Sequence, residues 1–133
     1  MITALDTPIL LDVFTGDPEH LAGSQSALRT ALREGRLILC EVVLAELRPC
    51  FPNRKTLLEA LDRLGADFQP CSRAASLVAG EAWKRYRQAG GKRAHLIPDF
   101  LVAAHAQDAA DRLLTRDRGF YRRWFRGLKL LQP

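Results

Sequence analysis

The sequence predicts a single α/β domain built around a mostly parallel sheet. Three observations lead to this fold class. The length of 133 residues suits one domain over residues 1–133. The composition, 47% apolar and 26% charged, is ordinary for a soluble globular protein. Short apolar segments also alternate with longer helical patterns along the chain, and this alternation is typical of a parallel sheet whose strands are joined by helices.

The first half of the chain provides three strands and four helices. Pro8 falls in the first turn of the first helix, where proline is tolerated. Pro49 stops the short third helix, and Gly65 closes the fourth. The predicted elements, in order, are a strand at 2–5, a helix through 6–14, a helix at 20–34, a strand at 36–40, a helix at 41–47, a helix at 53–64 and a weak strand at 66–70.

The second half continues the alternation. A long helix ends at the Gly90-Gly91 pair, and Pro98 marks the start of the next, apolar helix. The predicted elements are helices at 72–88, 97–109 and 118–125 and strands at 112–115 and 128–132. Four to five strands would therefore make up the central sheet.

Charge and cysteine content narrow the class of protein. The net charge of +5 and the pI of about 9.6 weakly favour a polyanionic partner. Cys40, Cys50 and Cys71 follow no CxxC or Cys/His spacing, which indicates reduced cysteines in a cytoplasmic protein. We expect no signal peptide and no membrane span, because no apolar run approaches the roughly 20 residues that a span requires.

Four acidic residues fall where a parallel sheet would gather them. Asp6 follows the first strand, Asp117 follows the fourth, Glu46 lies in the helix after the second, and Asp99 opens the helix that leads into the fourth. Functional sites in open α/β sheets form at the carboxyl ends of the strands. The four side chains could therefore meet at one edge.

Each acid also has a purely structural interpretation. Asp6, Asp99 and Asp117 stand near helix starts, where a carboxylate caps free N–H groups. Glu46 is different, because its short helix is otherwise apolar and offers no polar face. We expect Glu46 among apolar neighbours, where a carboxylate must be paired, protonated or bound to metal.

A divalent cation would reconcile several carboxylates in one pocket. Clustered acids raise one another's pKa values, and a bound cation removes that conflict. Carboxylates without Cys or His ligands are hard oxygen donors that suit Mg²⁺ or Mn²⁺. Such ions commonly serve phosphoryl chemistry.

The sequence resembles the PIN domain, and more closely the VapC-type toxin ribonucleases of type II toxin–antitoxin systems. Four segments that carry the resemblance occur in the expected order, and the closing LKLLQP joins them. These segments are ALDTPILLDVF, EVVLAEL, PDFLVAAHA and LLTRDRGFYRRWF. One departure is Pro8, where the family frequently has Asn or Ser.

The resemblance implies a PIN-like three-layer α/β/α sandwich and an endoribonuclease that hydrolyses RNA with a metal-activated water. It assigns Asp6, Glu46, Asp99 and Asp117 to the catalytic metal site, with Thr115 in support. It further implies Mg²⁺ or Mn²⁺ as cofactor, a cut that leaves a 3′-hydroxyl and a 5′-phosphate, a VapB-type antitoxin and a homodimer.

Other residues outside the four acids have possible binding roles. Four basic residues are candidate RNA contacts: Lys92, Arg93, Arg116 and Arg118. Arg116 and Arg118 could instead be surface residues or hold neighbouring carboxylates. The aromatic residues at 121, 124 and 125 are expected in the core. Glu41 is expected to compensate the helix dipole and not to bind metal, and Asp12 to be structural or peripheral to the substrate. The three histidines show no ligand spacing and are expected at the surface or in the core. The alternative function is a non-catalytic PIN-like module that binds RNA or protein.

Overall fold

Five strands form an all-parallel central sheet in the computed structural model, which describes residues 1–92 and 95–133. Within those residues, every pair of neighbouring strands is parallel, and the strand order is β3-β2-β1-β4-β5. The strands are β1 (Ile2–Leu5), β2 (Arg36–Leu39), β3 (Ala66–Phe68), β4 (Arg112–Leu114) and β5 (Leu130–Leu131). The predicted fold class and strand number are confirmed.

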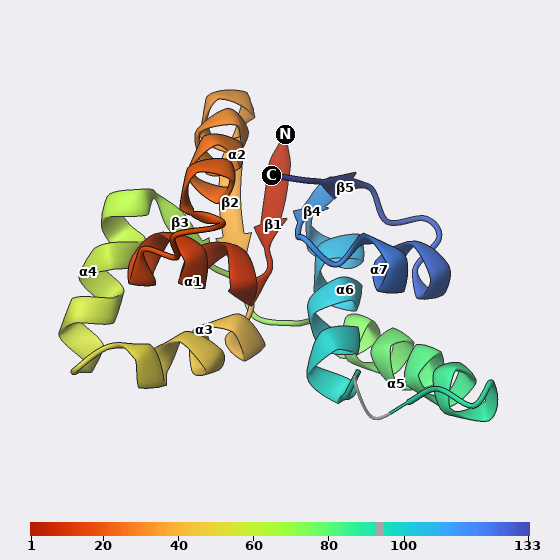
Figure 1. The fold of residues 1–133 in the computed structure, drawn as a ribbon. Helices are drawn as coiled ribbons and strands as arrows, with labels where there is room; N and C mark the ends of the chain where they lie inside the picture. The colour runs from red at the N-terminus through yellow and green to blue at the C-terminus, as the bar shows by residue number, and fades with distance from the viewer. Residues whose placement is uncertain (93–94) are drawn as a thin grey trace.

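The helices cover both faces of this sheet, so the molecule has the three layers that were predicted. They are α1 (Thr7–Thr15), α2 (Leu21–Glu34), α3 (Glu41–Leu47), α4 (Arg54–Leu64), α5 (Arg73–Gln88), α6 (Ile97–Ala109) and α7 (Arg118–Trp124), with a 3₁₀ turn η1 (Arg48–Cys50) after α3. Helices α1 to α4 lie on one side of the strands and α5 to α7 on the other (Figure 1). Right-handed crossovers explain this division, because the chain moves outward from β1 to β3 and then returns past β1 to β4.

Local capping accounts for most helix boundaries. The side chains of Asn53 and Ser72 accept hydrogen bonds from backbone N–H groups in the first turns of α4 and α5. Gly65 ends α4 in the left-handed conformation, as its position in the sequence predicted. Pro49 ends α3, but the chain continues through the turn η1 rather than leaving as a loop.

The core is built from the central strands and from aromatic residues of α6 and α7. Strands β1, β2 and β4 are buried almost throughout, as expected of a parallel sheet covered on both faces. Tyr121 and Phe125 are also buried, while Trp124 packs against the core at partial exposure. The aromatic residues of this segment therefore serve the core, as predicted.

The junction between α2 and β2 depends on a close approach at Gly35. A Cβ atom at this position would lie 1.8 Å from the carbonyl oxygen of Met1. The same carbonyl accepts a hydrogen bond from the N–H of Arg36 at 2.9 Å, at the start of the β1–β2 pairing. In the part of the chain that the structure describes, no helix is long and apolar enough to cross a membrane.

Candidate functional site

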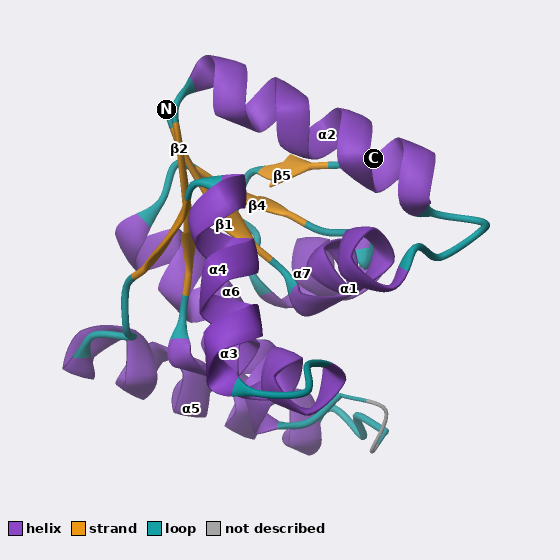
Figure 2. Ribbon diagram, turned by 90° about the vertical axis from the view of Figure 1, so that its left-hand side faces the viewer, coloured by secondary structure: helices purple, strands orange, loops and turns teal. Residues whose placement is uncertain are grey.

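The candidate site lies where β1 and β4 end side by side. Leu5 pairs with Leu114, and the N–H of Asp6 donates to the Leu114 carbonyl at 3.1 Å. Helix α1 begins directly after β1, and α7 begins a few residues after β4; the two strands run side by side in the sheet (orange in Figure 2). The parallel pairing therefore brings Asp6 next to the segment that carries Thr115 and Asp117.

Asp6 is a buried carboxylate held by three donors. Its Oδ1 accepts the N–H of Thr7 at 2.9 Å, and its Oδ2 accepts the hydroxyls of Thr115 at 2.7 Å and of Tyr121 at 3.3 Å. Burial nevertheless raises the pKa of Asp6 to about 6, with a smaller contribution from the nearby Asp99. A neighbouring positive charge would therefore stabilise the ionised form of Asp6.

Asp99 approaches from the other face of the sheet. It lies in the first turn of α6, and its Oδ2 accepts the N–H of Leu96 at 3.1 Å. Burial raises the pKa of Asp99, and the charge of Asp117 raises it further. Asp99 therefore interacts electrostatically with Asp117 and also with Asp6.

Asp117 follows β4 and contacts a histidine that spacing did not single out. Its N–H donates to the Thr115 hydroxyl at 3.1 Å, and its Oδ2 lies 2.9 Å from Nε2 of His95. The His95 ring stacks on Phe120, with centroids 3.9 Å apart and planes 2° from parallel. The reading of His95 as a plain surface or core residue is therefore incomplete. This contact spans 22 residues, and no local motif in the sequence signals it.

Glu46 was expected among apolar neighbours, and that expectation is wrong. Its side chain is exposed, as is Ala45, whereas Val43 and Leu47 are buried. A helix of only seven residues can bury one narrow side and leave the rest in solvent. Glu46 still turns toward the site, because its Oε1 accepts the Thr7 hydroxyl at 2.9 Å.

The capping interpretation applies to two of the acids. Asp6 caps α1 by accepting the N–H of Thr7, and Asp99 accepts the N–H of Leu96, the residue before α6. Asp117 occupies the N-cap position of α7 but makes no capping hydrogen bond. Its side chain contacts His95 instead.

The basic candidates occupy different surroundings. Arg116 donates to the buried Asp12 at 2.9 Å, so it holds a neighbouring carboxylate, which is one of the three roles predicted as possible for it. Asp12 also accepts the Ser24 hydroxyl at 2.5 Å, which makes it a structural acid as predicted. Arg118 and Lys92 are exposed, and Arg93 lies outside the described residues.

The donor set suits a hard cation, although the acids are loosely spaced. Among the described residues, no three of the four acids bring carboxylate oxygens within 4.8 Å of one another. Mg²⁺ is usually held through one or two carboxylates and keeps several of its waters, so such spacing is compatible with it. The raised pKa values of Asp6 and Asp99 are the physical signature of carboxylates that a cation would stabilise.

Sequence comparison identifies the family. The PIN domain family model matches residues 3–124. The chain belongs to the PIN domain family. The match includes Asp6, Glu46, Asp99 and Asp117, so all four acids lie within the PIN domain. No curated protein matches the sequence.

Solved structures share the fold of this PIN domain across nearly the whole chain. VapBC2 from Rickettsia felis, bound to a DNA fragment from its promoter, matches with 22% identity and a TM-score of 0.75, covering 99% of this chain and 98% of that chain. VapBC-1 from nontypeable Haemophilus influenzae matches with 18% identity, a TM-score of 0.75 and the same coverage, 99% and 98%. VapC20 from Mycobacterium tuberculosis, a Sarcin-Ricin loop cleaving toxin, matches with 14% identity and a TM-score of 0.64, covering 96% of this chain and 98% of that chain. At these identities the likeness establishes the fold.

Proposed function

We propose that this PIN domain is a Mg²⁺- or Mn²⁺-dependent endoribonuclease and the toxin of a cytoplasmic toxin–antitoxin pair. The observation that carries the proposal is the buried Asp6, whose pKa is raised by burial and by Asp99 at the carboxyl end of a parallel sheet. Two contacts support including the other acids: Thr115 donates to Asp6 and accepts the backbone N–H of Asp117, and the Thr7 hydroxyl donates to Glu46. PIN domain membership supports nuclease chemistry at this edge.

Asp6, Glu46, Asp99 and Asp117 would hold the cation. A bound Mg²⁺ or Mn²⁺ would supply a water of lowered pKa and would offset negative charge developing on the phosphate. The cleaved bond would be the P–O3′ bond of the RNA backbone, leaving a 3′-hydroxyl and a 5′-phosphate.

The surrounding side chains keep the carboxylates ready for this task. Thr115 is fully buried, and its hydroxyl donates to the Asp6 carboxylate and accepts the backbone N–H of Asp117, so it connects Asp6 to the segment that carries Asp117. Tyr121 is a second hydroxyl donor to Asp6, and burial raises its pKa, so it stays protonated. The Thr7 hydroxyl donates to Glu46 and so orients its side chain.

RNA and antitoxin are the partners that we infer. The net charge of +5 persists despite the acids gathered at the site, so the remaining surface is more basic than the total suggests. The exposed Lys92 and Arg118 are candidate phosphate contacts, together with Arg93, whereas Arg116 would act through Asp12. The VapBC names of two related structures support a VapB-type antitoxin, and the Sarcin-Ricin loop cleavage named for VapC20 supports an RNA substrate. That the toxin is a homodimer is inferred from the family resemblance alone.

The proposal is tested by cleavage of RNA with the purified protein, with Mn²⁺ and with chelator. Wild-type protein should cut only with metal, and Asp99→Asn should reduce the rate by about 100-fold or more because a ligand is lost. Asp62→Asn, an exposed acid on α4, is the matched control and should cut normally. Folded, metal-loaded wild-type protein that leaves all RNA ends unchanged would contradict the proposal.

A non-catalytic RNA- or protein-binding module remains the alternative, and the loose spacing of the acids favours it. That module would bind RNA equally well with and without metal and would never cut. Brief induction in cells without an antitoxin separates the two, since a nuclease should arrest growth and create new RNA ends. Co-expression of the antitoxin should restore growth.

A further inference from the structure

A second group of metal-ligating side chains lies away from the four acids, at the ends of β2 and β3. Cys40 ends the β2 segment and caps α3, and Cys71 lies in the connection from β3 to α5. The parallel pairing of β2 with β3 continues through the N–H of Gln69, which donates to the Leu39 carbonyl at 2.9 Å. Glu41 then accepts the N–H of Cys71 at 2.8 Å. Two segments 30 residues apart are thereby held together at this point.

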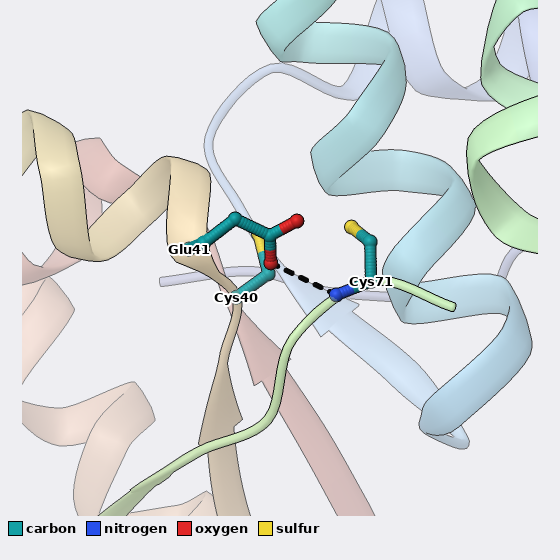
Figure 3. Close-up of side chains that lie close together, drawn as sticks. All are labelled: Cys40, Glu41 and Cys71. Atoms are coloured by element: carbon teal, nitrogen blue, oxygen red, sulfur yellow. Dashed lines mark hydrogen bonds between the residues drawn. The ribbon is translucent and has the colours of Figure 1, made fainter. Parts of the chain in front are cut away.

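The three side chains turn toward one another. One ligand atom from each of Cys40, Glu41 and Cys71 lies within 4.8 Å of the others. In Figure 3 one oxygen of Glu41 contacts the Cys71 backbone, and the other projects on the side of the Cys71 sulfur. Sulfur atoms bound to one tetrahedral zinc ion at about 2.3 Å stand roughly 3.8 Å apart, so adjustments of about 1 Å would complete the geometry.

We propose that Cys40, Glu41 and Cys71 form a binding site for a thiophilic divalent cation of the zinc type, separate from the acidic site of the nuclease. Thiolates are soft ligands that select Zn²⁺ over Mg²⁺, and one carboxylate with two thiolates is a normal zinc ligand set. Glu41 is exposed, which gives the ion a path from solvent and leaves the fourth position to water.

The surroundings favour a cation over a disulfide. Burial raises the pKa of both thiols, so neither is a reactive thiolate at neutral pH. A cation would bind with release of the two thiol protons and would neutralise the thiolates that form. His105 lies beside this group on α6, close enough to interact electrostatically with Glu41. It is buried, and its Nε2 has no hydrogen-bond partner among the described residues.

The test uses the reduced, chelator-treated full chain, with Zn²⁺ alone and Co²⁺ alone as probes. We expect one ion per chain, and thiolate-to-cobalt charge-transfer absorption with Co²⁺. Cys71→Ser should weaken binding at least ~100-fold. Cys50→Ser is the matched control, because Cys50 is exposed and outside the group, and it should bind as the wild type does. Excess Mg²⁺ should not displace the ion, and Asp99→Asn should leave it bound.

A second measurement avoids dependence on folded variants. Alkylation of the wild-type protein, mapped by mass spectrometry, should become slower at Cys40 and Cys71 on addition of Zn²⁺ and remain unchanged at Cys50. Equal alkylation with and without Zn²⁺, or binding that Cys71→Ser leaves intact, overturns the proposal. Ready formation of a Cys40–Cys71 disulfide under mild hydrogen peroxide, with no ion bound after reduction, also overturns it and assigns the pair to redox chemistry.

Discussion

The carboxylates of the site differ in how the fold surrounds them. Asp6 is buried and triply hydrogen-bonded, whereas Glu46 is exposed and held by a single hydroxyl. Both were predicted as ligands from their positions in the sequence. Their substitution should nevertheless have different effects on stability, because only one of them loses solvent on folding.

Glu46→Gln should separate catalysis from stability. Glutamine can still accept the Thr7 hydroxyl, and the position is exposed, so the free energy of unfolding should change by less than about 1 kcal/mol. RNA cleavage with Mn²⁺ should fall by about 100-fold or more, because a ligand charge is lost. Glu81→Gln, an exposed glutamate on α5, is the control for both assays. A destabilised but fully active Glu46→Gln protein would remove Glu46 from the site.

Asp6→Asn should have a pH-dependent effect on the metal-free protein. The folded pKa of Asp6 is raised to about 6, above its usual value, so wild-type stability falls as pH rises from about 4 through 6. The variant lacks this loss. The free energy of unfolding of the variant minus that of the wild type should therefore be larger at pH 7.5 than at pH 4, by up to about 3 kcal/mol. Urea denaturation at both pH values measures the difference, and a constant difference would contradict the burial argument.

At the scale of elements, the packing of β1 against β2 leaves no room beside Gly35. Gly35→Ala would place a methyl group against the Met1 carbonyl and push the start of β1 off its register. We expect a loss of about 2–4 kcal/mol in the free energy of unfolding. Gly80→Ala makes the same chemical change inside α5, where nothing lies within 4 Å of the added carbon. It should stabilise the protein by about 0.5–1 kcal/mol through helix propensity. Equal effects of the two substitutions would rule out the steric explanation.

At the scale of the whole molecule, one ion pair joins three distant segments. Arg116, after β4, contacts Asp12 of α1, which also accepts the hydroxyl of Ser24 in α2. Arg116→Ala would leave the buried Asp12 without its cation. We expect a cost of about 1–3 kcal/mol, reduced from that of a fully buried pair because Arg116 is partly exposed. Arg118→Ala, at the exposed neighbouring arginine, is the control and should lower the free energy of unfolding by less than about 0.5 kcal/mol. Thermal denaturation of both variants measures the difference.

Sequence patterns were sufficient for the order of elements and for the positions of Asp6 and Asp117 after the neighbouring strands β1 and β4. Alternating apolar segments and helix caps are local signals, and a parallel sheet converts strand order into position. Three features were out of reach: the exposure of Glu46, the contact of His95 with Asp117, and the proximity of Cys40 to Cys71. Each depends on how distant segments pack against one another, and the spacing of residues in the sequence does not predict that packing.

The strand order also has a consequence for synthesis. Strand β1 lies between β2 and β4, and Thr3 of β1 pairs with Arg112. A ribosome makes β1 before helices α1 to α6 and β4 only after them, so the central strand waits for its second neighbour while those helices are synthesised. The segments that carry Asp6 and Asp117 come together only with that pairing. Under the proposed function, a nascent chain should therefore be unable to cut RNA, and folding should be slow because this strand pairing is so distant in sequence. An inhibitor translated at the same time would have that interval in which to be ready.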